Sequence, residues 1–354
     1  MSRFFPCLAV LLCAGAAHAQ PAAAPQVPLI DTHVHFQSAG EMDFHSSLQE
    51  ALRHMDQRRI AMSLLMSPPR AHRPARGNYD VEELLQAIGE HRNRFAVLGG
   101  GGSLTQMIER ASPEAVTEEV RRDFRRRAED ILAQGAVGFG EMFVQHLSLP
   151  SMGAGHPYEN VPADHPLMLL LADIAAERGV PVDVHCDLVP EDMPLPDALH
   201  SPPNPAQLRA NRAGFERLLA HNRRAPIIWS HVGFEPLNTR DPQLVREMLA
   251  AHPNLYMSFR INRTGPRNTM AMDESDRLKP GWMALIREFP DRFMLGSDVF
   301  YARQGLGPGS SVEGLDRMRA LVSQLPRPLA RRVAFGNAQR LYKLDAVKIP
   351  EGQQ

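Results

Sequence analysis

Two histidines separated by a single residue stand near the start of the chain, in the segment PLIDTHVHF at residues 28–36. If this segment is a β-strand, His33 and His35 lie on one face about 7 Å apart, because successive side chains alternate between faces. Imidazole nitrogens bind zinc and related divalent ions, and two of them at this separation can reach one ion. The pair alone is equally compatible with two hydrogen-bonded histidines, so the interpretation depends on further ligands.

Three further side chains of metal-ligand type follow apolar runs. His185 stands near the end of PVDVHCD, His231 near the end of IIWSHVG and Asp298 near the end of FMLGSDVF. Parallel strands would bring these positions to the same height in a sheet. Three independent placements of this kind favour a metal site over a chance grouping.

The elements that must position these residues follow an alternating pattern. Strand candidates cover residues 28–36, 60–67, 95–101, 136–144, 180–187, 226–232, 254–260 and 292–298. Helical patterns cover 46–58, 80–91, 113–134, 166–178, 206–222, 242–251, 281–288, 312–321 and 329–344. Strand followed by helix, repeated eight times, predicts an α/β protein with one domain, a (β/α)8 TIM barrel over residues 28–345. An open doubly wound sheet is the second fold considered.

Two long connections, 145–165 and 188–205, follow the fourth and fifth strand candidates and are rich in Pro, Gly and Met. In a barrel they lie at the rim that carries active sites, so we expect them to cover the substrate. They also carry four histidines, each expected at the surface: His146, His156, His165 and His200.

Residues 1–19 have the pattern of a secretory signal peptide, with Arg3, a short apolar run and the cleavage site Ala17-His18-Ala19. Cleavage after Ala19 predicts a secreted or periplasmic protein. Residues 20–27 are then an Ala/Pro-rich leader before the barrel, and residues 346–354 are a C-terminal tail after it. The apolar run is shorter than the roughly 20 residues that span a bilayer, so no stable membrane insertion is expected.

Composition excludes two classes of protein. Of the 354 residues, 44% are hydrophobic and 22% charged, which excludes a disordered chain. The 39 Lys and Arg residues against 40 Asp and Glu residues leave no basic excess for a nucleic-acid backbone. A small-molecule substrate is therefore the expected partner, and homo-oligomerisation is left open.

The set His33, His35, His185, His231 and Asp298 resembles the metal site of the amidohydrolase superfamily of barrel enzymes. The segment FGNAQRLYKL, residues 335–344, is similar to the C-terminal signature of its amidohydrolase-2 branch, which contains hydrolases and decarboxylases. The resemblance implies one or two divalent metal ions, usually zinc, at the barrel mouth, together with an activated water molecule.

Many members of that superfamily bridge two metals with a carbamylated lysine on strand four, but here lysine occurs only at Lys279, Lys343 and Lys348. Glu141, in GAVGFGEMFVQ, stands near the place of the bridging group. It is either a metal ligand or an acid that orients a histidine or pairs with an arginine.

Two arrangements of the site follow. With one ion, His33, His35, His185 and Asp298 hold the metal and His231 moves protons or polarises a carbonyl. With two ions, His33, His35 and Asp298 hold the first, His185 and His231 hold the second, and Glu141 bridges them. In both, Asp298 is also expected to carry a proton.

Arg260 is the candidate substrate-binding residue. In NLYMSFR, Tyr256, Ser258 and Arg260 share a face expected to point into the barrel. The guanidinium could hold a substrate carboxylate or form a salt bridge with Asp298, Glu141 or a loop acid. By the same alternation, Trp229 shares a face with His231 and is a candidate pocket wall, with packing in the core as the alternative.

Together these features predict a secreted metal-dependent hydrolase that cleaves an ester, lactone or amide bond of a small organic molecule, of which a carboxylate is one candidate. A metal-dependent decarboxylase of an aromatic or unsaturated acid would use the same ligands. A catalytically silent metal-binding barrel is the third hypothesis.

Overall fold

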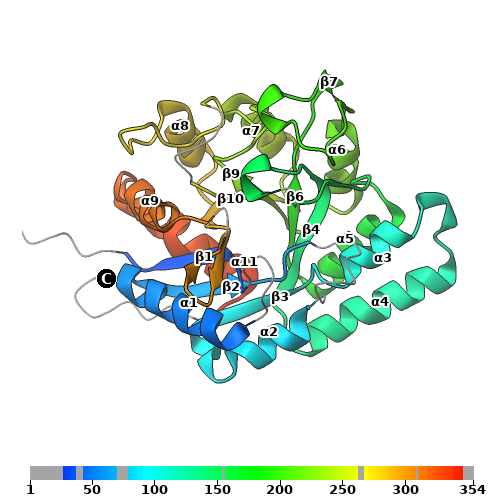
Figure 1. The fold of residues 1–354 in the computed structure, drawn as a ribbon, viewed down its shortest axis with the longest axis horizontal. Helices are drawn as coiled ribbons and strands as arrows, with labels where there is room; N and C mark the ends of the chain where they lie inside the picture. The colour runs from blue at the N-terminus through cyan, green and yellow to red at the C-terminus, as the bar shows by residue number, and fades with distance from the viewer. Residues whose placement is uncertain are drawn as a thin grey trace, which may run out of the picture.

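The computed structural model describes residues 27–36, 43–69, 79–153, 156–261, 267–307 and 310–345 (Figure 1). The signal peptide, most of the leader and the C-terminal tail lie outside these ranges, and their assignments stay predictions. No helix in the described part of the chain is long and apolar enough to cross a bilayer.

Eight parallel strands form a closed barrel. They are β1 (Leu29–His35), β2 (Ile60–Leu65), β3 (Phe95–Gly100), β4 (Gly138–His146), β6 (Val182–Cys186), β9 (Ile227–Val232), β10 (Leu255–Phe259) and β11 (Phe293–Leu295). Neighbours pair in this order around the ring, and the register of Asp31 on β1 with Leu295 on β11 closes it. Each strand overlaps its predicted segment, so the barrel is confirmed and the open sheet is excluded.

Helices surround the barrel in the alternating order that was predicted. They are α1 (Phe44–Arg58), α2 (Val81–Ile88), α3 (Leu104–Arg110), α4 (Glu118–Ala133), α5 (Pro166–Arg178), α6 (Arg212–His221), α7 (Pro242–Ala251), α8 (Pro280–Glu288), α9 (Val312–Ser323), α10 (Arg327–Arg331) and α11 (Asn337–Tyr342). Proline at the first helical position starts α5, α7 and α8, where its missing N–H costs no intrahelical bond. Helix α3 was not predicted, and α6 begins at Arg212, later than the predicted residue 206.

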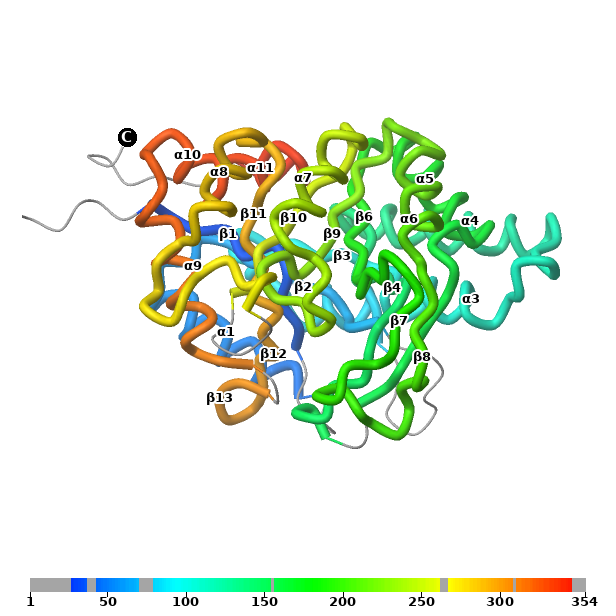
Figure 2. The backbone as a smooth tube through the Cα atoms, turned by 90° about the horizontal axis from the view of Figure 1, so that it is seen from above, coloured from blue at the N-terminus to red at the C-terminus, as the bar shows by residue number. Residues whose placement is uncertain are grey.

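The two ends of the barrel differ. Figure 2 shows α10 and α11 at one end and short strands, labelled β7, β8, β12 and β13, at the other. These strands are β7 (Met193–Pro194), β8 (Gln207–Leu208), β12 (Val299–Ala302) and β13 (Gly305–Leu306). They follow β6 and β11 in the chain, so this second end is the one at which the barrel strands terminate and where the predicted site residues lie.

The two long connections fold together as a cap, which we define as residues 147–153, 156–165 and 188–211. Apolar side chains from these segments, with Leu237, form a cluster separate from the main core: Leu147, Val189, Leu195, Leu199 and Leu208. Asn204 ties the two connections by accepting from Ser148 N at 2.8 Å and donating to Ser148 O at 2.8 Å. The cap therefore has its own packed interior.

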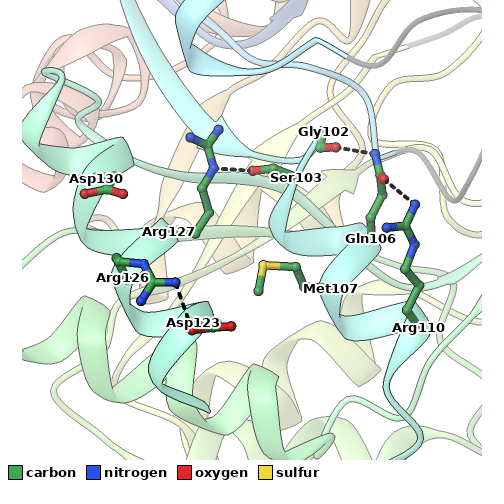
Figure 3. Close-up of a pocket in the computed structure, with 9 residues that line it drawn as sticks. All are labelled: Gly102, Ser103, Gln106, Met107, Arg110, Asp123, Arg126, Arg127 and Asp130. Carbon is green, nitrogen blue, oxygen red and sulfur yellow. Dashed lines mark hydrogen bonds and ion pairs between the residues drawn. The ribbon is translucent and has the colours of Figure 1, made fainter. Parts of the chain in front are cut away.

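Arg127 on α4 holds α2, α3 and α4 together. Its guanidinium donates to Glu82 Oε1 at 2.6 Å and Asp80 Oδ2 at 3.3 Å, and its Nε donates to Ser103 Oγ at 2.9 Å. It lines a cavity of about 410 Å³ between α3 and α4 (Figure 3), which contains none of the predicted site residues. The hydrogen bonds from Arg127 lower the pKa of Glu82 to about 2.

We expect Glu82→Gln to lower the free energy of unfolding at pH 7 by up to about 1 kcal/mol, because the ion pair is partly exposed. The folded pKa of Glu82 lies below its ordinary value of 4.5. This stabilisation is therefore complete above about pH 5 and is lost as the pH falls toward 2. Denaturant unfolding of both proteins between pH 7 and pH 3 should show the difference shrinking. Glu118→Gln, in an exposed pair with Arg121, is the matched control. A pH-independent difference for Glu82→Gln would contradict the charge-based explanation.

Candidate metal centre

The six predicted ligand side chains converge at the end of the barrel. His33 and His35 come from β1, Glu141 from β4, His185 from β6 and His231 from β9, while Asp298 follows β11. All are buried except His185, whose side chain is 13% exposed. The structure thus brings together residues as far apart in the chain as His33 and Asp298.

Glu141 lies between two pairs of histidines. Its Oε1 is 2.9 Å from His185 Nδ1 and 3.0 Å from His231 Nε2. Its Oε2 is 3.4 Å from His33 Nε2 and 3.6 Å from His35 Nε2. Oε2 therefore faces His33 and His35, the first pair, and Oε1 faces His185 and His231, the second pair.

Asp298 lies on the side of the first pair. Its Oδ1 is 3.2 Å from His35 Nε2 and 3.8 Å from His33 Nε2, while its Oδ2 is 2.5 Å from Arg260 Nη1. Ligand atoms lie within 4.8 Å of one another in two groups, His33 with His35 and Asp298, and His33 with Glu141 and His231. Arg260 thus forms one of the salt bridges that were considered for it.

Groups behind the first histidine pair set the orientation of its rings. His35 Nδ1 lies 2.9 Å from the carbonyl oxygen of Met66, and because a carbonyl only accepts, Nδ1 carries the hydrogen. His33 Nδ1 lies 3.3 Å from Asp183 Oδ1, which favours the same tautomer. Both rings therefore present the Nε2 lone pair to Glu141 and Asp298. Within the described residues neither nitrogen of the His33 ring makes a hydrogen bond, so Nε2 is available as a ligand atom.

The electrostatics of the cluster favour positive charge. Burial opposes protonation of His33, yet Asp183 and Glu141 hold its pKa well above the ordinary value. Burial likewise opposes protonation of His185, but Asp187 and Glu141 raise its pKa to about 10. Burial disfavours ionised Glu141, but His33 and the other histidines hold its pKa well below the usual range. A donor set of buried imidazoles and carboxylates that attracts protons this strongly fits a divalent cation.

The backbone at two site residues departs from regular strand geometry. His231 has φ 63° and Asp298 has φ 56°, in the left-handed region that residues other than glycine rarely adopt. This ends the side-chain alternation of β9. Trp229 packs against Phe215 of α6, with ring centroids 5.2 Å apart, while Ser230 donates to Asp183 at 2.5 Å. The prediction that Trp229 shares a face with His231 is therefore wrong.

Three of the four histidines predicted at the surface are not exposed. His156 is half-buried, and its Nδ1 accepts from Leu149 N at 2.9 Å. His146 is half-buried, with its ring centroid 4.6 Å from that of His185, and burial lowers its pKa to about 4. His165 is buried, and its Nδ1 accepts from Leu167 N at the start of α5. His200 is exposed, as predicted.

Sequence reasoning also missed the acids behind the histidines. Asp183 lies behind His33, and Asp187 Oδ2 is 3.4 Å from His185 Nε2. Both stand two residues from His185 in PVDVHCD, the spacing that puts side chains on one face of a strand. That spacing was a signal available in the sequence.

A family model described as Amidohydrolase matches residues 30–344. The chain belongs to the amidohydrolase family. This family consists of enzymes, and its members bind divalent metal ions. No curated protein matches this amidohydrolase in sequence.

Solved structures similar to this amidohydrolase have different activities. Dihydroorotase from Campylobacter jejuni is 14% identical over 94% of this chain and 88% of its own, with a TM-score of 0.51. The 5-carboxyvanillate decarboxylase of Sphingomonas paucimobilis is 13% identical over 90% and 100%, with a TM-score of 0.44. That of Novosphingobium aromaticivorans, with bound manganese, is 12% identical over 91% and 98%, with a TM-score of 0.48. At these identities the likeness concerns the fold alone, so it leaves the reaction open.

Replacing His33 and His35 together by Ala should abolish metal retention, because both belong to the group that includes Asp298. Elemental analysis of the purified protein should find metal reduced to less than about a tenth of wild type, in line with the loss of two ligands. Circular dichroism should still show the barrel. His200→Ala, at an exposed position, is the control and should keep the metal. Wild-type metal content in the double variant would contradict the assignment.

Proposed function

We propose that this amidohydrolase is an exported metal-dependent hydrolase that cleaves an ester, lactone or amide bond of a small organic molecule. The observation that carries the proposal is the division of the two Glu141 oxygens between two histidine pairs. A carboxylate in this place is suited to bridge two ions, and two-metal sites are typical of hydrolytic enzymes. Export rests on the pattern of residues 1–19 and the cleavage site after Ala19.

In this proposal His33, His35 and Asp298 hold one ion, His185 and His231 hold the second, and Glu141 bridges them. Zinc suits such a set of imidazoles and carboxylates. Bound divalent ions would lower the pKa of a water molecule toward about 7 and polarise a substrate carbonyl.

Asp298 is the proposed proton carrier when two ions are bound, and His231 joins it in the one-ion arrangement, where it holds no metal. Asp298 Oδ2 lies 3.9 Å from His231 Nδ1, so the two groups border the same space. Burial lowers the pKa of His231 to about 4, so its ring is neutral at pH 7 and offers Nε2 as a ligand atom on the Glu141 side. Burial opposes ionisation of Asp298, but Arg260 and His231 hold its pKa well below the usual range. Arg260 stabilises the ionised carboxylate of Asp298. If Arg260 binds a substrate anion instead, the pKa of Asp298 should rise and its carboxylate should become a stronger base.

The proposed approach for a substrate is past His185 and Arg260. Their side chains are 13% and 12% exposed, whereas those of His33 and His35 are fully buried. The Arg260 guanidinium lies 4.5 Å from the ring centroid of Phe234 and pairs with Asp298 through Nη1. It is the proposed binding group for a substrate carboxylate. The cap is the proposed cover over the substrate.

Arg260 also favours the decarboxylase as a second candidate function, since a decarboxylase must hold the carboxylate that it removes. The same metal ligands would then serve, with His231 and Asp298 carrying protons. A catalytically silent barrel is disfavoured, because all six side chains of ligand type converge in the structure.

The bridge is tested by the metal content of Glu141→Gln. We expect about two ions per chain in the wild type and about one in the variant, because an amide is a poor bridging ligand. Glu235→Gln, at a buried acid outside the cluster, is the control for general loss of stability and should keep both ions. One ion in both wild type and Glu141→Gln would contradict the bridge. Incorporation of oxygen-18 from labelled water into product would support hydrolysis, whereas release of carbon dioxide would establish the decarboxylase.

The role of Arg260 is tested by Arg260→Lys, which keeps the charge and loses the planar fork. For substrates that bear a carboxylate, KM should rise about 10- to 100-fold, the value of a charged hydrogen bond. For neutral substrates KM should change little. An equal change for both classes would indicate that Arg260 acts only through Asp298.

A further inference from the structure

A buried carboxylate that the proposed mechanism does not use lies behind His185. Asp187, the residue after β6, is 4% exposed. Its Oδ2 is 3.4 Å from His185 Nε2, on the side of the ring opposite to the Nδ1 that faces Glu141. The imidazole of His185 therefore lies between two carboxylates.

The contacts on its two nitrogens limit how the His185 ring can bind a cation. Nδ1 makes the closer contact, a hydrogen bond of 2.9 Å with Glu141, whereas Nε2 faces Asp187 at 3.4 Å as an ion pair. A cation between Nδ1 and Glu141 takes the Nδ1 lone pair, so the ring hydrogen stays on Nε2, toward a carboxylate that only accepts. Without Asp187, the ring could rotate or carry its hydrogen on Nδ1, and either change would remove the ligand atom.

Asp187 is itself held by the cap. The same oxygen, Oδ2, accepts from Leu147 N at 2.8 Å, and Leu147 packs in the apolar cluster of the cap. The main-chain oxygen of Asp187 accepts from Gln145 Nε2 at 3.2 Å and from Asn211 Nδ2 at 3.1 Å. Both connections that form the cap thus contact the residue that orients His185.

We propose that Asp187 is a positioning residue that directs Nδ1 of His185 toward the second ion and links this ligand to the cap. The inference rests on the proposed two-metal function. Asp187 acts on one ion only, because the histidines of the first pair are oriented by Asp183 and by the Met66 carbonyl.

Asp187→Ala and Asp187→Asn separate orientation from charge. In Asp187→Asn the Leu147 N–H requires the amide oxygen at the position of Oδ2, where it still accepts from His185 Nε2. We expect Asp187→Asn to bind the second ion within a few-fold of wild type. Asp187→Ala should bind it 10- to 100-fold more weakly, the usual loss for a residue that orients a ligand. The first ion should be unaffected in both.

The measurement is titration of the metal-depleted full chain with zinc against a chelator of known affinity. Circular dichroism and thermal unfolding of the metal-free proteins establish that the variants are folded. Wild-type affinity for the second ion in Asp187→Ala would overturn the proposal. Equal weakening in Asp187→Ala and Asp187→Asn would overturn it too, because charge and not orientation would then be the cause.

A second measurement does not depend on the variants folding. In the cadmium-loaded wild type with nitrogen-15 histidine, coupling to cadmium-113 identifies the ligating nitrogen. We expect His185 to couple through Nδ1, and His185→Gln assigns its signal. Coupling through Nε2 would overturn the inference. A wild type that binds a single ion would overturn the two-metal function, and this is read from the wild type alone.

Discussion

The structure of the site depends on one constraint, that a carboxylate buried among imidazoles must be matched by positive charge. Glu141 is enclosed by four histidine rings, and each of its oxygens faces two of them. Burial alone would keep this acid neutral, because an ionised group loses its hydration in the interior. The surrounding histidines stabilise the ionised carboxylate and hold the pKa of Glu141 below its usual range. Protons or metal ions must therefore occupy the positions between Glu141 and the rings, and the donor types suit metal ions.

The barrel supplies the geometry that this constraint requires. Strands that end at one rim bring side chains from five parts of the chain within a few ångströms. Regular strand geometry would not direct all of these side chains toward Glu141. The left-handed backbone conformations of His231 and Asp298 change the direction of their side chains. Arg240 donates to the Ser230 carbonyl at 2.5 Å, next to His231, and so supports that conformation from behind. Such backbone positions are commonly found where function and not stability selects the conformation.

Substrate recognition is connected to the same charges. Arg260 is partly exposed and pairs with Asp298, so an anion that attracts Arg260 would also change the environment of the proposed proton carrier. On the other side, the cap contacts Asp187, which faces His185. Substrate binding and metal coordination would thus be coupled through two direct contacts, each involving a buried acid.

The sequence by itself determined the barrel, because apolar periodicity and strand-end chemistry are local properties that each segment carries. His33, His35, Glu141, His185, His231 and Asp298 could be named for this reason. Only the tertiary structure decided that each Glu141 oxygen faces one histidine pair, that Arg260 pairs with Asp298, and that His146 lies beside His185. These contacts join residues far apart in the chain, and no periodicity within one segment records which partner it meets. The same holds for His231 and Trp229, because one left-handed residue changes the direction of a side chain without altering the residue pattern from which the face was predicted.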